Sequence, residues 1–182
     1  FTGGQIRYAM IGTVRANVLR FILLVLLQAL VIDHFDLANG WVVPYIYVLF
    51  ILLLPFDTPD WATLLLGFVL AMTMDMFSST PGMHASACVV MAYARILTLR
   101  ALVPREGYDP GKRPIIQHMG LAWFTTYAGV LILIHHLWLF FVEVYRFDDF
   151  LSTFIRALMS AIATFILCLL AQALLSRDIR TR

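Results

Sequence analysis

The sequence has 182 residues; 62% of them are hydrophobic, 13% are charged, and the formal net charge is +2. An average soluble domain has roughly 45–50% apolar and about 25% charged residues, so this composition excludes an ordinary soluble protein and indicates a membrane protein. Because every backbone N–H and C=O in hydrocarbon must be paired within the protein, such a chain forms helices or a closed barrel. Its long apolar runs, which do not alternate at a period of two, predict an all-α fold.

The first apolar run covers residues 18–32 and follows the basic residues Arg7 and Arg15. Secretory signals also have a basic flank before an apolar run, but the sequence DHFD that follows offers no small-residue cleavage site. We therefore expect the first run to be a retained membrane helix.

The second and third apolar runs, residues 41–54 and 61–76, are separated by the turn PFDTPD. In this turn Thr58 is a favourable N-cap, Pro59 suits the first helical position, and Asp60 stabilises the positive end of the helix dipole. Both runs are short for a membrane span of roughly 17–25 residues. We expect two helices joined by a turn in the headgroup region.

The fourth helix is expected over residues 82–102, after SSTPG, where Thr80 can cap the helix and Pro81 can open it. The stretch VPREGYDPGKRP that follows, residues 103–114, is rich in proline, glycine and charged side chains. Such a stretch cannot lie in hydrocarbon, and it predicts a hydrophilic loop.

Two further apolar runs, residues 115–142 and 150–175, predict the fifth and sixth helices. The whole chain, residues 1–182, is then one polytopic membrane domain with six transmembrane helices. Cytoplasmic loops are enriched in Lys and Arg, and most basic residues fall on one side of this topology: Arg7, Arg15, Arg20, Arg100, Arg105, Lys112, Arg113, Arg177, Arg180 and Arg182. Both termini and the 103–114 loop are therefore predicted to be cytoplasmic. The outer loops would hold acidic residues: Asp33, Asp36, Glu143, Asp148 and Asp149.

Small and polar residues recur every four positions in the third helix, at Thr63, Gly67, Ala71 and Asp75. Residues at this spacing share one helix face, and small side chains allow close packing of membrane helices. Gly82 and Ala85 open the fourth helix in the same way. We expect these faces to form a helix-packing or partner interface.

Asp75 is the only carboxylate in the third helix beyond its first residues, and two roles are open for it. It can cap the start of the fourth helix or reach the membrane interface, or it can organise the outer loop or meet a partner. Proton transport would require several acids at membrane depth, which the sequence does not show.

Other candidate residues carry less information. His135 and His136 point about 100° apart on a helix, so they do not suit one metal, and the nearby aromatic residues predict a position at the membrane interface. Cys88 and Cys168 lie in apolar runs and are expected to pack as small residues. The sequence has no phosphate loop, zinc-protease or hydrolase motif and no basic stripe for nucleic acid. We therefore expect no catalytic residue, no metal and no cofactor.

Seven residues in the third helix and at the start of the fourth correspond to a family pattern: Gly67, Phe68, Ala71, Met72, Asp75, Gly82 and Ala85. The region resembles the rod shape-determining protein MreD family of bacteria, which shows Gly-Phe, then Gly-Leu, then Asp, followed by Gly with a nearby Ala. Pro55, which closes the second run, also fits. The family prefers Gly and Leu where this chain has Ala71 and Met72, and both replacements keep size and polarity close.

The resemblance implies a non-enzymatic scaffold of the cell-elongation machinery in the bacterial inner membrane, which supports lateral peptidoglycan synthesis. Its direct partner would be the single-pass protein MreC and surrounding lipids; MreB, a SEDS glycosyltransferase and a penicillin-binding transpeptidase would act beside it. The family is similar in fold to the substrate-binding subunits of energy-coupling factor transporters, which gives an alternative function as a small-molecule-binding subunit. Those subunits carry Ala-xxx-Ala in their first helix, whereas here Ala16 is followed by Arg20. A third hypothesis is a membrane enzyme that uses Asp75 with His84 or the His135 pair.

Overall fold

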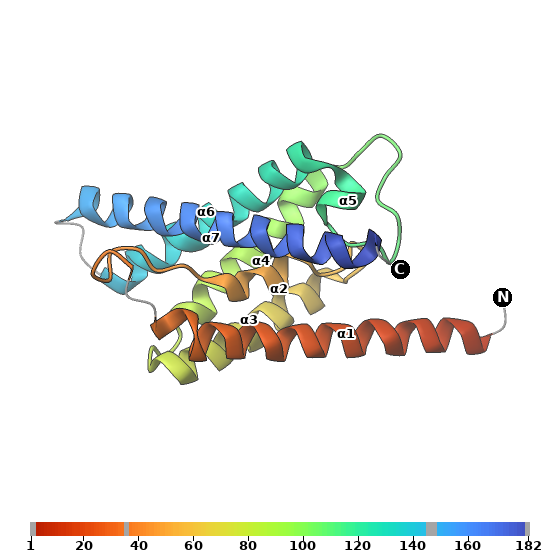
Figure 1. The fold of residues 1–182 in the computed structure, drawn as a ribbon, viewed down its shortest axis with the longest axis horizontal. Helices are drawn as coiled ribbons and strands as arrows, with labels where there is room; N and C mark the ends of the chain where they lie inside the picture. Colours follow the sequence, from red (N-terminus) through yellow and green to blue (C-terminus); the bar gives the residue numbers. More distant parts are fainter. Residues whose placement is uncertain (1–2, 35–36, 145–148, 181–182) are drawn as a thin grey trace.

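The computed structural model describes residues 3–34, 37–144 and 149–180, and the side chains at 12, 14–34, 37–144 and 149–174. Five long helices dominate the fold: α1 (Gly3–Leu30), α3 (Asp60–Ser78), α4 (Met83–Ala101), α6 (Leu121–Val144) and α7 (Phe150–Arg180). Four short elements complete it: η1 (Ile32–His34), η2 (Ile46–Val48), α2 (Leu49–Leu52) and α5 (Ile116–Met119). The described residues form no strand, so the all-α prediction is confirmed (Figure 1).

Four stretches of the described chain are long and apolar enough to cross a membrane. They are Val14–His34, Asp60–Ser78, Leu121–Val144 and Phe150–Leu174. Large apolar side chains on their outer faces, such as Leu23, Leu65 and Ile162, are about half exposed. A surface with this much apolar area is typical of contact with lipid, which indicates a multi-pass membrane protein.

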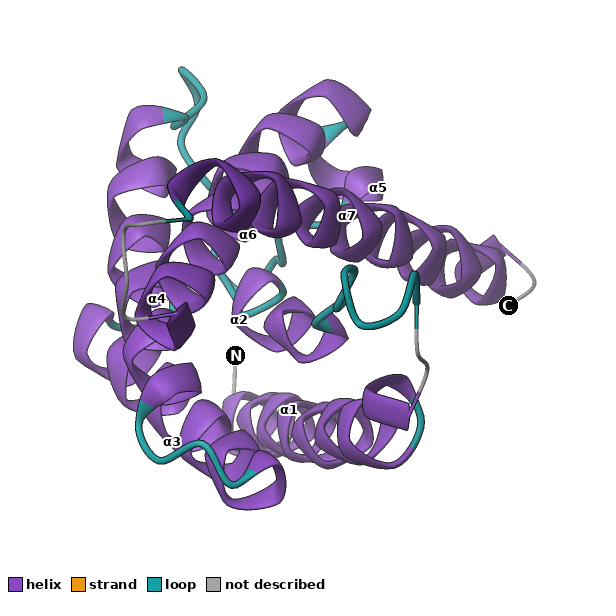
Figure 2. Cartoon of the chain, turned by 90° about the vertical axis from the view of Figure 1, so that its left-hand side faces the viewer, coloured by secondary structure: helices purple, strands orange, loops and turns teal. Residues whose placement is uncertain are grey.

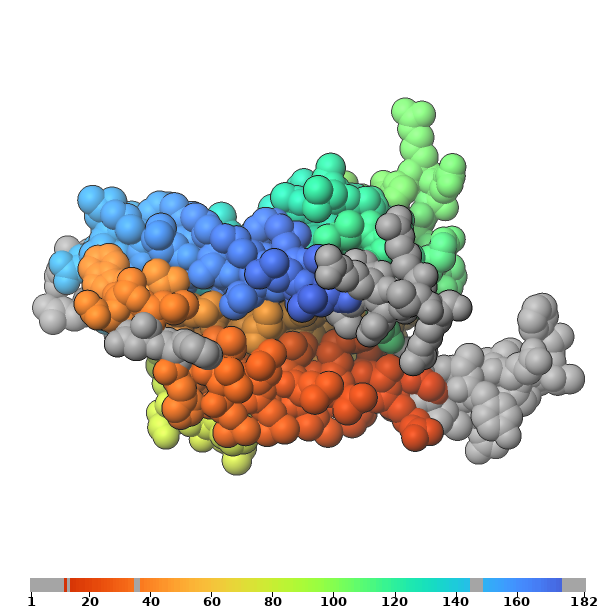
Figure 3. All heavy atoms as spheres, viewed as in Figure 1, coloured from red at the N-terminus to blue at the C-terminus, as the bar shows by residue number. Residues whose placement is uncertain are grey.

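The long helices surround a short central element. Helices that follow one another in the chain pack together, α3 on α4 and α6 on α7. In addition, α4 packs on α6, and α1 packs on α3. Figure 2 shows these helices arranged around α2. Both α1 and α7 also contact η2, and the chain that follows α1 lies between these two helices on the face shown in Figure 3.

The second apolar run differs most from its prediction as a helix over 41–54. Only η2 and α2, residues 46–52, are helical, and the chain before them is not. We call residues 42–55 the central segment. Pro44 restricts the residue before it to extended conformations and so opposes an earlier helix start, and each residue from Ile46 to Leu54 is at most 5% exposed.

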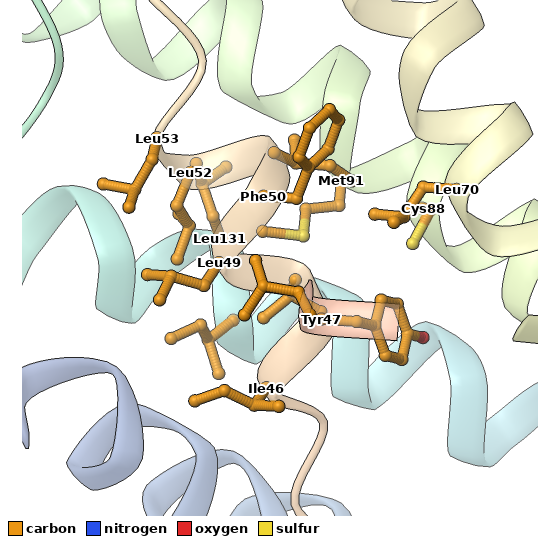
Figure 4. Packing of buried hydrophobic residues seen from close by; sticks show 14 of the residues in the cluster. Ile46, Tyr47, Leu49, Phe50, Leu52, Leu53, Leu70, Cys88, Met91 and Leu131 are labelled. Carbon is orange, nitrogen blue, oxygen red and sulfur yellow. The ribbon is translucent and has the colours of Figure 1, made fainter. Parts of the chain in front are cut away.

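A helix that is apolar on every side suits burial by protein on every side. In Figure 4 the side chains of the central segment point in all directions, with Met91 near Phe50 and Leu131 near Leu49. The run of apolar residues therefore reflects a protein core rather than a lipid-facing span.

Other helix ends also differ from the predictions. Pro59, not Thr58, is the N-cap of α3, and the Thr58 hydroxyl donates instead to the carbonyl of Pro55 at 2.8 Å. Gly82, not Thr80, is the N-cap of α4. The predicted helix over 115–142 is divided into α5 and α6 at Gly120, whose φ of 84° L side chains rarely adopt.

The bundle has two distinct ends. At the first, which we call the loop end, the end of α4 meets the start of α3, where Arg100 pairs with Asp60 at 2.7 Å. The 103–115 loop meets the turn before α3, where the N–H of Phe56 donates to the carbonyl of Lys112 at 3.0 Å. At the other, which we call the cavity end, the end of α1, the α3–α4 turn and the end of α6 line a common cavity. Of the acidic and basic residues predicted in the loops and termini, Asp36, Asp148 and Arg182 lie outside the described residues.

The 103–115 loop is fixed to the bundle by aromatic side chains. Tyr108 stacks on Phe56 with 4.3 Å between ring centroids, and its hydroxyl donates to the carbonyl of Leu99 at 2.9 Å. Burial raises the pKa of Tyr108 to about 12, so the phenol remains a hydrogen-bond donor at neutral pH. The indole N–H of Trp123 donates to the carbonyl of Leu102 at 3.1 Å.

Candidate functional site

The start of the central segment is bonded by side chains from α1 and α7. Gln28 accepts from the N–H of Ile46 at 2.7 Å and donates to the carbonyl of Pro44 at 3.1 Å. The hydroxyls of Ser160 and Thr164 accept from the backbone of residues 43 and 45 at 3.0 and 2.9 Å. A buried backbone group left unpaired costs about 1–3 kcal/mol, so these three side chains allow a non-helical chain to lie inside the bundle.

The end of the central segment is bonded by Arg95 of α4, which is 1% exposed. Its Nη2 donates to the carbonyls of Leu54 at 2.6 Å and Pro55 at 3.2 Å, and its Nε donates to the Tyr127 hydroxyl at 3.0 Å. That hydroxyl in turn donates to the carbonyl of Leu52 at 3.0 Å. The buried positive charge thus faces the free carbonyls at the C-terminal end of α2, where a helix carries partial negative charge.

A tyrosine and two histidines meet beside the central segment. The Tyr47 hydroxyl lies 2.8 Å from Nδ1 of His84 and 3.0 Å from Nε2 of His135, and Nδ1 of His135 has no partner. A hydroxyl has one hydrogen. The arrangement that costs least has Nε2–H of His135 donating to Tyr47 and the Tyr47 hydroxyl donating to Nδ1 of His84. Nδ1 of His135 is then an acceptor without a partner, which costs less when buried than a donor without a partner.

A second chain of hydrogen bonds runs through His136. Nδ1 of His136 lies 2.8 Å from the carbonyl of Ile132 and must therefore carry the hydrogen. Nε2 then accepts from the Thr164 hydroxyl at 2.9 Å, and Thr164 accepts from the N–H of Tyr45. The Tyr45 ring packs against His84, His135 and His136 with centroid distances of 5.3–6.0 Å. Both α6 histidines are fully buried in the bundle, and their position at the depth of the membrane interface stays a prediction.

The predicted small-residue face of α3 lies against α4. Thr63, Gly67 and Ala71 are buried. A Cβ at Gly67 would lie 3.2 Å from Cβ of Ala92 and 3.3 Å from the carbonyl oxygen of Cys88. These distances are shorter than most real Cβ contacts, so any larger residue at this position would require α3 and α4 to move apart by a few tenths of an ångström or more.

Asp75 lies at the end of this face and is 3% exposed. Its carboxylate accepts from the N–H groups of Gly82, His84 and Ala85 at 3.0–3.1 Å and from the Thr80 hydroxyl at 3.0 Å. It therefore closes the turn between α3 and α4 and pairs the free N–H groups at the start of α4. This arrangement corresponds to the capping role that was one of the two expected for Asp75.

Three other predicted interface residues are placed differently from one another. Ala85 is buried, at 3% exposure, next to the Asp75 carboxylate. Phe68 is 44% exposed on the outer face of α3. Gly82 is exposed, and a Cβ there would meet nothing within 4 Å; its φ of 85° explains the glycine instead.

A cavity of about 570 Å³ opens at the cavity end of the bundle. Tyr45 and His84 line it together with apolar side chains such as Met83 and Leu139, and Asp33 and Glu143 supply carboxylates. Its volume is within the range of small-molecule sites, roughly 300–1,000 Å³. The described residues contain no group of three or more His, Cys, Asp or Glu side chains that could hold a metal ion, and Cys88 and Cys168 are buried free thiols.

The small-residue face of α3 and Asp75 could be predicted from the sequence, whereas the residues that bond the central segment were not predicted. Gln28, Arg95, Tyr127, Ser160 and Thr164 each place a polar group in an apolar stretch. Buried polar groups in membrane helices are costly unless bonded, so this placement is the signal that could have marked them. No protein-family model matches the sequence, and neither a curated protein nor a solved structure matches the chain.

Proposed function

We propose that this protein is a non-enzymatic membrane scaffold of the MreD type in the rod-shape complex. The observation that carries the proposal is that buried polar side chains are used to bond the protein's own backbone. Gln28, Arg95, Asp75 and Thr164 all do so. Among the described side chains, three buried polar atoms lack a partner: Oγ1 of Thr63, Nδ1 of His135 and Nε2 of Gln172. Such use of polar groups supports a structural role.

We further propose that the chain crosses the bacterial inner membrane six times, with the central segment as the second crossing. The central segment is bonded by Gln28 near the cavity end and meets the 103–115 loop at the loop end. Non-helical chain is tolerated at membrane depth where protein surrounds it. Basic residues at the loop end favour a cytoplasmic position for it, with the carboxylates of Asp33 and Glu143 outside.

The proposed partner is a single-pass membrane protein with an outer coiled coil, such as MreC, whose helix would lie against the apolar outer faces of the bundle. MreB, the SEDS glycosyltransferase and the penicillin-binding transpeptidase would be connected through that partner. Close packing of α3 on α4 around Gly67 supports this mechanism, because a rigid bundle presents its outer faces in one fixed arrangement.

The Gly67→Leu variant tests this mechanism. The larger side chain would push α3 away from Ala92 and the Cys88 carbonyl, and overpacking of this kind costs about 1–3 kcal/mol or more. We expect the variant to insert into the membrane but to recover at least several-fold less single-pass partner after purification in mild detergent.

Gly129→Leu is the matched control, because a Cβ at Gly129 of α6 would meet nothing within 4 Å. It should keep the stability of the unmodified protein. Unchanged partner recovery and stability in Gly67→Leu would contradict the packing mechanism, and failure of the unmodified chain to retain such a partner would contradict the scaffold itself.

The cavity favours one alternative, a small-molecule-binding subunit of the energy-coupling factor type. Its volume of about 570 Å³ would hold a vitamin-sized ligand. Arg20, at the position where those subunits carry the second alanine, donates to the Asn17 side chain at 3.0 Å. A stoichiometric complex with an energising module would favour this alternative over the scaffold.

A further inference from the structure

The cavity at the cavity end joins groups from four parts of the chain. Asp33 comes from η1, Tyr45 from the central segment, His84 from α4 and Glu143 from α6. Met83 and Leu139 supply apolar wall. The cavity therefore has charged, aromatic and apolar surfaces, which is the combination that small-molecule sites use to fix the orientation of a ligand.

Two carboxylates line this cavity, and one of them lies near a guanidinium. Asp33 is held by the Gln28 amide, which donates to its Oδ1 at 2.6 Å. Glu143 lies 3.6 Å from Arg156 of α7. The Arg156 guanidinium is also over the Phe140 ring, 4.8 Å from the centroid, and 3.4 Å from the carbonyl of Gly40.

The other titratable groups near the cavity do not reverse the net negative charge of Asp33, Glu143 and Arg156 taken together. His34 and His84 line the cavity, and the Asp75 carboxylate is occupied by the start of α4. The negative charges of Asp33 and Glu143 and the positive charge of Arg156 act on the Tyr45 hydroxyl in opposite senses. The cavity wall thus holds two carboxylates, and the one guanidinium near them, that of Arg156, balances only one of the two charges.

We infer that this cavity binds a primary ammonium group, with the apolar part of the ligand against Met83 and Leu139. An ammonium has three N–H donors and no acceptor, and the carboxylates of Asp33 and Glu143 are strong acceptors for it. The Tyr45 ring adds the aromatic surface that attracts cations. The inference rests on the cavity alone and requires neither the scaffold nor a transporter.

The ammonium could belong to a free amine or to a lipid headgroup, and both sources can be tested on the intact protein. The probes are cadaverine, glutarate as an anion of similar length, and nanodiscs that contain phosphatidylethanolamine or phosphatidylglycerol. Binding of the two small molecules is measured by calorimetry in detergent, and retained lipid by native mass spectrometry. Cadaverine binding or selective retention of phosphatidylethanolamine is expected, and the arm that succeeds identifies the source.

The double variant Asp33→Asn with Glu143→Gln should reduce binding by about tenfold or more, because the ammonium loses both of its charged acceptors. Glu106→Gln, at the loop end, is the control of equal chemistry and should leave binding unchanged. Ala29→Phe keeps every charge but fills the cavity from α1, and it should also reduce binding. Circular dichroism and gel filtration establish that each variant is folded.

Three results would overturn the inference. They are the absence of binding in both arms, equal binding of glutarate, or unchanged binding in the folded double variant and in Ala29→Phe. Partner recovery in the Gly67→Leu experiment is measured independently, so failure here leaves the scaffold proposal to its own test.

Discussion

Replacing Arg95 by methionine is expected to lower the free energy of unfolding by about 3–5 kcal/mol. Methionine fills similar space but leaves the carbonyl of Leu54 without its Arg95 donor and the carbonyl of Pro55 with only its donors from Thr58. Hydrogen bonds to a charged group contribute about 1.5–3 kcal/mol each, and the loss is largest where the remaining partner is buried. Unfolding in mixed micelles of increasing denaturing detergent measures the change.

Arg100→Met is the matched control for this prediction. Arg100 lies on the same helix, and its pair with Asp60 has side chains 68% and 59% exposed. Exposed pairs contribute about 0–1 kcal/mol, so the control should be nearly neutral. Equal stability of the two variants would show that the contacts of Arg95 with the central segment do not stabilise the fold.

Asp75→Asn is expected to lower the free energy of unfolding by about 2–4 kcal/mol. An amide in place of the carboxylate would turn a donor toward the N–H groups of Gly82 and Ala85 or of His84. Loss of a cap costs about 0.5–2 kcal/mol, and each buried N–H left unpaired adds about 1–3 kcal/mol. The same detergent titration measures this loss of stability.

Asp60→Asn provides the comparison, since Asp60 is an exposed carboxylate in the first turn of α3. Its interaction with the helix dipole is worth about 0.3–1 kcal/mol. If Asp75→Asn lost no more stability than Asp60→Asn, the capping role of Asp75 would be wrong. Normal cell shape in a strain with a stable Asp75→Asn protein would also remove the third hypothesis, an enzyme that uses this carboxylate.

The long helices could be predicted because apolar composition determines them directly. Four of the six predicted segments coincide with stretches of the described chain that are long and apolar enough to cross a membrane. The α3 face was visible as well, since Gly67 and Ala71 recur at helical spacing and both are buried. The spacing of residues along one helix is sufficient to predict its packing face where that helix is joined to its neighbour by a short turn.

The central segment could not be predicted from its own residues. An apolar run such as 46–54 has the same composition whether lipid or protein surrounds it. What decides between them is the set of polar partners at its ends, and Gln28, Arg95 and Thr164 come from three other helices. Their contacts link positions far apart in the chain, which helical periodicity does not show.

The histidines illustrate the same limit. His135 and His136 point in different directions along α6, as their spacing requires, yet both find hydroxyl partners, in Tyr47 and in Thr164. An aromatic-rich helix end is typical of the membrane interface, so the sequence favoured that position. The partners lie on the central segment and on α7, and the α6 sequence contains no sign of them.

Hydrogen–deuterium exchange of the protein in nanodiscs tests most directly the claim that side chains of surrounding helices complete the backbone bonds of the central segment. We predict that amides of residues 46–54 exchange as slowly as those of α3, and that Arg95→Met accelerates exchange there more than it does in α3. Exchange of residues 46–54 as fast as that of the 103–115 loop in the unmodified protein would contradict this claim.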